Sequence, residues 1–215
     1  MTVKVKICGT NSLEAGRAAV ENGAAYFGLV FYPPSPRSVT PEEAGAIARA
    51  LPAGPWRVGL FVDAEDALFE QAIAAAGLDL LQLHGGETPE RVAALKARFG
   101  LPAMKAIRVA ATEDVAEAER YFDVADCLLF DAKPPATMTG ALPGGNALSF
   151  DWRLIAGRDW PLPWMLSGGL TAANLAEAVS TSGTHAVDVS SGVEDRPGHK
   201  DPARIAAFLA AARAL

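Results

Sequence analysis

The feature that most constrains the fold of this chain is a regular alternation of short apolar, β-branched runs with alanine- and glutamate-rich stretches. The apolar runs have the length of strands, and eight are expected: Val3–Ile7, Ala25–Val30, Arg57–Phe61, Leu78–Leu83, Ala103–Ile107, Cys127–Asp131, Pro163–Leu166 and Ala186–Val189. The other stretches have helical spacing and are expected as helices: Ser12–Glu21, Pro41–Leu51, Ala64–Ala76, Pro89–Phe99, Thr112–Tyr121, Ala172–Val179 and Asp201–Ala212. Strand followed by helix, repeated, predicts parallel strands joined by right-handed crossovers.

Eight such units predict an α/β fold, a single (β/α)8 TIM barrel of eight parallel strands with outer helices, spanning residues 1–215 as one domain. Each unit averages about 27 residues, which is near the lower limit for this barrel. An open, doubly wound sheet is the main alternative. No GxGxxG follows the first strand, and GxxxxGK followed by Ser or Thr is absent, so that alternative lacks its usual phosphate loop.

Several expected helices carry start and stop signals. Thr40 precedes Pro41 and stands three residues before Glu43, which is the arrangement of a capping box. Gly77 and Gly100 lie where two helices should end.

Composition argues against several kinds of partner. The net charge is −6 and no lysine- or arginine-rich run occurs, so no nucleic-acid partner is expected. No apolar run reaches ~18 residues and no signal-peptide pattern begins the chain, so we expect no membrane partner and a cytoplasmic location. Cys8 and Cys127 are too few for a disulfide framework, and the three histidines are far apart, so no metal site is expected.

Polar residues follow the expected strands at their carboxyl ends, where a barrel places its active site. Cys8 ends the first strand, and its thiol can act as a base or nucleophile once ionised, or can be a small buried hydrophobe. Asp131 ends the sixth strand and can act as a general acid when protonated, or cap a loop. On strands 1 and 6 the two can face each other across a small substrate, the layout of an isomerisation by proton transfer.

Three further residues are candidates for binding substrate. Arg37 lies in a proline-rich loop, and its guanidinium can fork onto a carboxylate, the alternative being an ordinary solvated arginine. His84 follows the fourth strand and can contact a ligand or bond locally. Asp188 on strand 8 is the third candidate. Lys6 shares the strand parity of Cys8 and should point into the barrel, where an ion pair with Asp188, mainly structural, is expected.

Two glycine-containing loops predict a phosphate site. Barrels often bind phosphate through backbone amides in the loops after strands 7 and 8, and glycine lets the backbone approach an anion closely. The candidate residues are Gly168 and Gly169 after strand 7, and Ser190, Ser191 and Gly192 after strand 8. Each loop alone also fits a tight turn, but the pair occurs in the two expected places.

The motifs together resemble the phosphoribosylanthranilate isomerase family of tryptophan biosynthesis, over nearly the whole chain from Lys6 to Asp201. The matching pieces are KICG at 6–9, GLVFYPPSPR at 28–37, VGLFV at 58–62, LQLHG at 81–85, FDAK at 130–133, FDW at 150–152, LSGGL at 166–170, AVDVSSGVE at 186–194 and the P-G-x-K-D pattern at 197–201.

The resemblance implies an Amadori rearrangement of N-(5-phosphoribosyl)anthranilate to 1-(2-carboxyphenylamino)-1-deoxyribulose 5-phosphate, without a cofactor. It implies that Asp131 is the general acid that opens the ribose ring and that Cys8, as thiolate, removes the C2′ proton. Arg37 would hold the anthranilate carboxylate, and the loops after strands 7 and 8 would hold the phosphate. The only partner expected is this small-molecule substrate, acted on by a monomer or homodimer.

One position departs from the family pattern. The family tends to have glycine where this chain has Ala147, within the loop between strands 6 and 7 that spans Lys133–Leu148. If that position requires a positive φ, alanine there costs about 1 kcal/mol of local strain.

Two other functions compete with this one. An aminoaldose isomerase of histidine biosynthesis on a similar barrel would be expected to use paired aspartates on strands 1 and 6, and strand 1 offers Cys8 instead. A non-catalytic phosphosugar-binding barrel would not need both Cys8 and Asp131.

Overall fold

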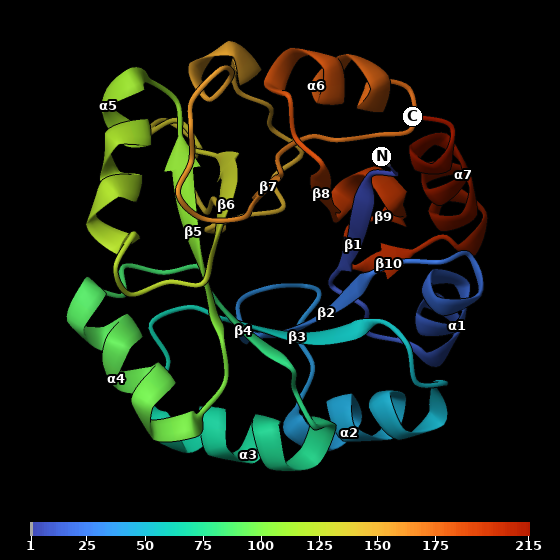
Figure 1. Cartoon of the computed structure of the whole chain (residues 1–215). Helices are drawn as coiled ribbons and strands as arrows, with labels where there is room; N and C mark the ends of the chain where they lie inside the picture. Colours follow the sequence, from blue (N-terminus) through green and yellow to red (C-terminus); the bar gives the residue numbers. More distant parts are fainter. Residues whose placement is uncertain (1) are drawn as a thin grey trace.

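In the computed structural model, which describes residues 2–215, eight parallel strands close into a barrel ringed by helices (Figure 1). The barrel strands are β1 (Lys4–Cys8), β2 (Tyr26–Phe31), β3 (Trp56–Phe61), β4 (Leu80–Leu83), β5 (Ala103–Val109), β6 (Cys127–Ala132), β7 (Trp164–Leu166) and β8 (Ala186–Val189). Because β1 pairs with both β2 and β8, the sheet has no open edge. The predicted (β/α)8 barrel is confirmed, and the doubly wound alternative is wrong.

The outer ring follows the predicted order of helices. Its α-helices are α1 (Leu13–Glu21), α2 (Pro41–Ala50), α3 (Asp66–Ala76), α4 (Pro89–Phe99), α5 (Thr112–Ala116), α6 (Leu175–Ser182) and α7 (Pro202–Arg213). Three short 3-10 turns are η1 (Glu117–Tyr121), η2 (Trp152–Leu154) and η3 (Ser191–Val193). Within residues 2–215, no helix combines the length and apolar character needed to cross a lipid bilayer.

The predicted helix signals are confirmed. Thr40 accepts a hydrogen bond from the Glu43 amide while the Glu43 side chain accepts one from the Thr40 amide, which completes the capping box at the start of α2. Gly77 and Gly100 end α3 and α4 in the left-handed conformation, with φ of 59° and 66°.

Many predicted element boundaries differ from the observed ones by one to three residues, and three differences have a larger effect on the elements. β4 begins at Leu80, not Leu78, because the chain is still turning there and Asp79 accepts a hydrogen bond from the Arg57 amide at 2.8 Å. The helix expected over residues 112–121 divides into α5 and the 3-10 turn η1. The helix expected to begin at Ala172 starts at Leu175.

The late start of α6 has a local cause. Thr171 and Asn174 exchange hydrogen bonds, the Thr171 amide to Asn174 Oδ1 at 2.8 Å and the Asn174 amide to Thr171 Oγ1 at 3.3 Å. This side-chain turn satisfies the backbone in a non-helical conformation, so the helix cannot begin before it closes.

The barrel interior consists of layers of inward-facing side chains. Val5 and Ile7 of β1 point outward and pack under the helices, whereas Lys6 and Cys8 point inward, as alternation along a strand requires. Towards the amino ends of the strands the interior is an apolar cluster of Val58, Leu80, Met104, Ala106, Leu129 and Met165. Towards the carboxyl ends it becomes polar, and the candidate site lies there.

A small antiparallel hairpin follows the barrel and was not predicted. It consists of β9 (Glu194–Arg196) and β10 (His199–Lys200), separated by a turn in which Gly198 has a φ of 82°. The hairpin lies next to β1 and β2 (Figure 1). Strands this short and polar lack the apolar alternation that identifies a strand in a sequence.

Candidate active site

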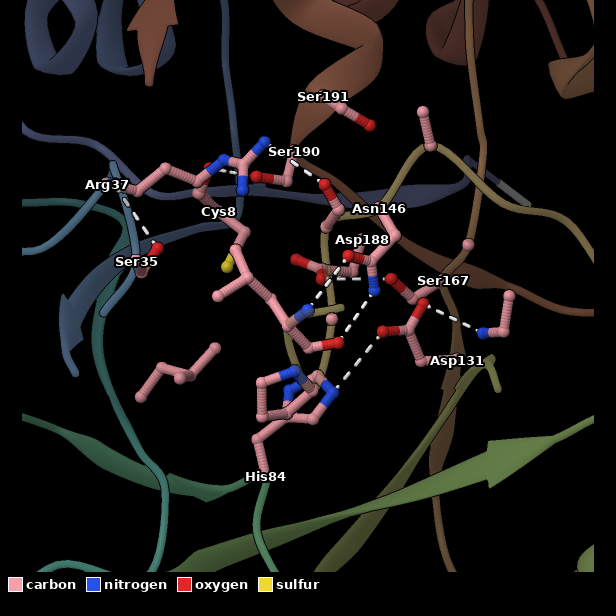
Figure 2. A pocket seen from close by; sticks show the side chains of 18 of the residues that line it. Cys8, Ser35, Arg37, His84, Asp131, Asn146, Ser167, Asp188, Ser190 and Ser191 are labelled. Atoms are coloured by element: carbon pink, nitrogen blue, oxygen red, sulfur yellow. Dashed lines mark hydrogen bonds and ion pairs between the residues drawn. The ribbon is translucent and has the colours of Figure 1, made fainter. Parts of the chain in front are cut away.

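A pocket opens at the carboxyl ends of the barrel strands and encloses about 720 Å³, including its open mouth. Its walls contain every residue predicted for the site except Gly192: Cys8, Arg37, His84, Asp131, Gly168, Gly169, Asp188, Ser190 and Ser191. Figure 2 shows the labelled side chains of this set converging from strands on opposite sides of the barrel. Residues far apart in the sequence are therefore brought together as predicted.

Cys8 lies at the end of β1 with its sulfur directed into the pocket (Figure 2). Burial raises the pKa of the thiol, and so does the Asp188 carboxylate, whereas Lys6 and Lys200 act to lower it. The net effect is a raised pKa, so the thiol is mostly protonated near neutral pH. The nearby ammonium groups can stabilise the thiolate that forms when Cys8 gives up its proton.

The floor of the pocket is the Lys6–Asp188 ion pair, and its prediction is confirmed. Lys6 Nζ lies 2.8 Å from Asp188 Oδ1, and both side chains are buried. Ser167 donates to the other carboxylate oxygen at 3.2 Å. Gly28, opposite Cys8 on β2, makes room, since a Cβ there would lie 3.0 Å from Lys6 Nζ. Burial acts to lower the pKa of the Lys6 ammonium, but the charges and hydrogen bonds of Asp188 and Cys8 together raise it, so Lys6 stays protonated.

Asp131 lies on β6, across the pocket from Cys8 (Figure 2). Its Oδ1 accepts a hydrogen bond from the Ala132 amide at 2.9 Å, and its Oδ2 lies 3.3 Å from His84 Nε2. Gln82 Nε2 is 3.1 Å from His84 Nδ1. With the amide in this orientation, Nδ1 accepts and the proton is on Nε2, facing Asp131. Of the two roles left open for His84, local bonding is thus observed, and the ring also lines the pocket.

Arg37 reaches the pocket from the loop after β2, and it is not the solvated side chain of the alternative interpretation. It is only 5% exposed and forms a two-pronged ion pair with Glu194, with Nε–Oε1 2.7 Å and Nη2–Oε2 2.8 Å. Nη2 also donates to the carbonyl of Gly145 at 3.2 Å. Nη1 has no hydrogen-bond partner among residues 2–215 and remains available to an anion.

The loops after β7 and β8 form one continuous cradle. Gly168 and Gly169 have φ of 95° and 62°, a backbone that other residues rarely adopt. A Cβ at Gly192 would lie 1.8 Å from the carbonyl oxygen of Leu170, so only glycine lets η3 pack against the β7 loop. Ser190 Oγ donates to the Cys8 carbonyl at 3.2 Å, which fixes the cradle to β1.

The β6–β7 loop lies over the mouth of the pocket. Gly144 lies against Asp131 and His84, since a Cβ there would be 2.6 Å from Asp131 Oδ2 and 2.8 Å from His84 Cε1. Asn146 exchanges two hydrogen bonds with the Leu142 backbone, which closes the turn (Figure 2). Ala147 has a φ of 56°, so this position does require a positive φ.

Several site residues were not predicted. Gln82 lies on β4 two residues before the predicted His84 and shares its inward-facing parity, and this polar spacing was a usable signal for Gln82. Glu194 and Lys200 lie in matched motifs but were assigned no role, because only the folded hairpin brings them to Arg37. Ser167 was identified only as the start of a glycine loop.

This geometry defines a class of protein: a (β/α)8 barrel enzyme with a carboxyl group and a thiol on opposite walls of its pocket and glycine-lined loops after β7 and β8 that suit a phosphorylated substrate. The model of the N-(5'-phosphoribosyl)anthranilate (PRA) isomerase family matches residues 5–211. The chain belongs to this family.

Relatives of the chain agree along its whole length. The N-(5'-phosphoribosyl)anthranilate isomerase of Rhodospirillum centenum is 60% identical over 215 residues, which is 100% of both chains. A crystal structure of phosphoribosyl anthranilate isomerase from Thermotoga maritima is 37% identical, covers 99% of this chain and 100% of its own, and gives a TM-score of 0.88. A structure of such an isomerase in complex with reduced 1-(o-carboxyphenylamino)-1-deoxyribulose 5-phosphate is 36% identical, with the same coverage and a TM-score of 0.85.

Proposed function

We propose that this chain catalyses the Amadori rearrangement of N-(5-phosphoribosyl)anthranilate to 1-(2-carboxyphenylamino)-1-deoxyribulose 5-phosphate in tryptophan biosynthesis. The observation that carries the proposal is the placement of a carboxylic acid, Asp131, and a thiol, Cys8, on opposite walls of one pocket. An aldose-to-ketose rearrangement needs one proton delivered and another removed, and this pair can do both. It moves a hydrogen within one molecule and so needs no oxidant or reductant.

In the first step, Asp131 donates its proton to the ribose ring oxygen. The C1′–O bond breaks, and the nitrogen lone pair forms a C1′=N bond, which gives an open-chain Schiff base. His84 beside Asp131 Oδ2 and the Ala132 amide at Oδ1 hold the carboxyl group in place for this transfer. A fixed donor close to the reacting atom is what general acid catalysis requires.

In the second step, the Cys8 thiolate removes the C2′ proton. The electrons of the C2′–H bond form the C1′=C2′ double bond, and those of the C1′=N bond return to nitrogen, giving an enolamine that tautomerises to the ketone. The Lys6 and Lys200 ammonium groups act to lower the pKa of Cys8 and so favour the thiolate.

The remaining site residues would hold the two anionic ends of the substrate. Arg37 would bind the anthranilate carboxylate through Nη1, and the cradle of Gly168, Gly169, Ser190, Ser191 and Gly192 would bind the phosphate through backbone amides and hydroxyls. Asp188 also lines the pocket, and both of its carboxylate oxygens already accept hydrogen bonds from Lys6 and Ser167. Its role would be to hold Lys6 and Ser167 and to present a polar floor to the ribose.

A fluorescence assay tests the function. N-(5-phosphoribosyl)anthranilate is generated in situ, the pure protein is added without metal or cofactor, and anthranilate fluorescence is followed. We expect rapid decay with the natural chain, and a Cys8→Ser variant that binds ligand but loses most turnover. Full activity of Cys8→Ser would remove Cys8 from the mechanism. No decay with folded protein would favour the aminoaldose substrate of histidine biosynthesis. Ligand binding without turnover of either substrate would favour a non-catalytic barrel.

Three further expectations belong with this function. The chain is expected to work as one domain, as a monomer or homodimer, and in the cytoplasm. Light scattering on the purified protein measures its mass, a single cooperative unfolding transition supports one domain, and fractionation of the source cells locates it.

A further inference from the structure

Arg37, Glu194 and Lys200 form a buried cluster of charged side chains that joins the proposed carboxylate site to the proposed phosphate cradle. Arg37 holds Glu194 through the two hydrogen bonds described above, and Lys200 Nζ donates to the same carboxylate, to Oε1 at 2.5 Å. Arg37, Glu194 and Lys200 are 5%, 6% and 4% exposed. Because two cations share one carboxylate, the cluster has a net charge of +1.

Lys200 extends the cluster to the phosphate cradle. Its Nζ donates to both the carbonyl and the Oγ of Ser190, each at 3.1 Å. Ser190 Oγ in turn donates to the carbonyl of Cys8. A chain of hydrogen bonds therefore runs from the guanidinium of Arg37 to the first residue of the β8 loop and to the strand that bears Cys8.

The hairpin that contains Glu194 and Lys200 packs against the loop after β2 that contains Arg37. A Cβ at Gly198 would lie 2.4 Å from the carbonyl oxygen of Pro36, so hairpin and loop are in direct contact. The Gly198 amide donates to Glu194 Oε2 at 3.3 Å, and Asn11 Nδ2 donates to the Gly198 carbonyl at 2.9 Å. The hairpin cannot shift without moving Arg37 and the start of α1.

The charge of the cluster suits the ligand proposed for the site. A buried cation without a counter-ion is costly. Burial lowers the pKa of Lys200 even though Glu194 opposes this, whereas hydrogen bonds from Arg37 and Lys200 overcome the burial of Glu194 and lower its pKa. Glu194 is thus ionised and shared, and the excess positive charge faces the cradle, where a phosphate would neutralise it.

We propose that Glu194 and Lys200 are positioning residues that set the separation between the carboxylate-binding guanidinium of Arg37 and the phosphate cradle. A substrate with a carboxylate at one end and a phosphate at the other would then be selected by its length. This inference rests on the proposed function, since it takes Arg37 and the cradle as the two anion sites.

Steady-state kinetics with Glu194→Gln and Lys200→Met test the proposal. Each substitution removes charge-assisted hydrogen bonds, so we expect the KM for phosphoribosylanthranilate to rise about 10- to 100-fold while kcat changes only a few-fold. Competitive inhibition by anthranilate should weaken most in Glu194→Gln, and inhibition by inorganic phosphate most in Lys200→Met. The double variant should lose less than the product of the two single losses, because the residues act as one unit.

Controls separate positioning from stability. Lys200→Arg should recover much of the affinity, and Glu117→Gln, which breaks an exposed pair with Arg120 on η1, should leave both constants unchanged. All assays are run well below each variant's melting temperature. If Glu194→Gln does not fold, the Lys200→Met and Lys200→Arg pair makes the same test.

The proposal is wrong if kcat falls with KM unchanged, if the single losses multiply, or if neither inhibitor is affected. Failure of the proposed function would look different: the natural chain would not turn over phosphoribosylanthranilate. Calorimetry would then compare the affinity of the natural chain and of Lys200→Met for inorganic phosphate. Weaker phosphate binding by Lys200→Met would support the role of Lys200, and equal binding would contradict it, with no enzyme activity needed.

Discussion

The two ends of the barrel interior are filled with different chemistry. Near the amino ends of the strands the interior residues are apolar, and Leu129 and Met104 are fully buried among their neighbours. Near the carboxyl ends the same barrel buries polar groups that include Lys6, Gln82 and Asp188. Both sets of side chains come from the same strands, often two residues apart.

The difference teaches how the barrel separates stability from chemistry. Burying apolar side chains is favourable without any specific partner. Burying Lys6 or Asp188 is favourable only when the partner is held at bonding distance, so the polar end must be assembled as a network. The apolar end supplies the rigid frame that keeps this network in register, and the predictions below test that division.

The largest effect is expected from Asp131→Asn, which removes the proposed general acid while keeping the shape of the side chain. We expect kcat/KM to fall by about 10²- to 10⁴-fold, because the ring oxygen loses its proton donor. Stability should change little, since the carboxamide oxygen of the new side chain would still accept from the Ala132 amide. The fluorescence assay and a urea melt measure both quantities. A variant that retained a tenth of its activity would assign the acid to another group.

Lys6→Met should damage both stability and activity, because within residues 2–215 it leaves buried Asp188 with Ser167 as its one side-chain hydrogen-bond partner. Removing one member of a buried ion pair typically costs about 3–5 kcal/mol. The double variant Lys6→Met/Asp188→Leu should regain most of the stability but none of the activity, as measured by urea unfolding and turnover. Recovery of activity in the double variant would show that the polar floor is only a structural element.

Leu129→Ala tests the apolar end alone. Leu129 is fully buried in the lower interior cluster, and its truncation should cost about 2–5 kcal/mol through lost burial and a residual cavity. At 20 °C, where the variant is folded, kcat and KM should stay within a factor of about three of the natural values. A large loss of kcat in the folded variant would mean that the lower layer also shapes the active site.

The barrel itself was predicted from the sequence better than the hydrogen-bond network of its polar end. The number and order of the strands and the direction of their side chains follow from the alternation along the chain. The Lys6–Asp188 pair follows once the barrel closes and places strand 8 beside strand 1. The pairing of Arg37 with Glu194 did not follow, because it depends on a hairpin whose two short polar strands have no apolar pattern. Gln82 was also missed, although its two-residue spacing from His84 indicates that both side chains face the inside of the barrel.

A smaller effect is expected from pH. Cys8 must be ionised to act as base, and its pKa is raised by burial and by Asp188, so the active thiolate is lost as pH falls through that raised value. Catalysis needs this thiolate together with a protonated Asp131, so we expect the profile of kcat/KM against pH to have two limbs, one from the thiol and one from the acid. The rate of Cys8 alkylation reports the thiol alone and should increase with pH by up to about tenfold per unit until the thiol is ionised. A profile of kcat/KM that is flat across neutral pH would contradict the assignment of Cys8 as base.

The smallest effect is expected from Ala147→Gly, in the loop that covers the polar end. Ala147 has a φ of 56°, a conformation in which its Cβ is strained and glycine is not. Relief of that strain should stabilise the chain by up to about 1 kcal/mol, although glycine also gains freedom in the unfolded state, which offsets part of the gain. Urea unfolding measures the sum. A destabilised variant would show that the strain of alanine at this φ is smaller than the freedom that glycine adds to the unfolded state.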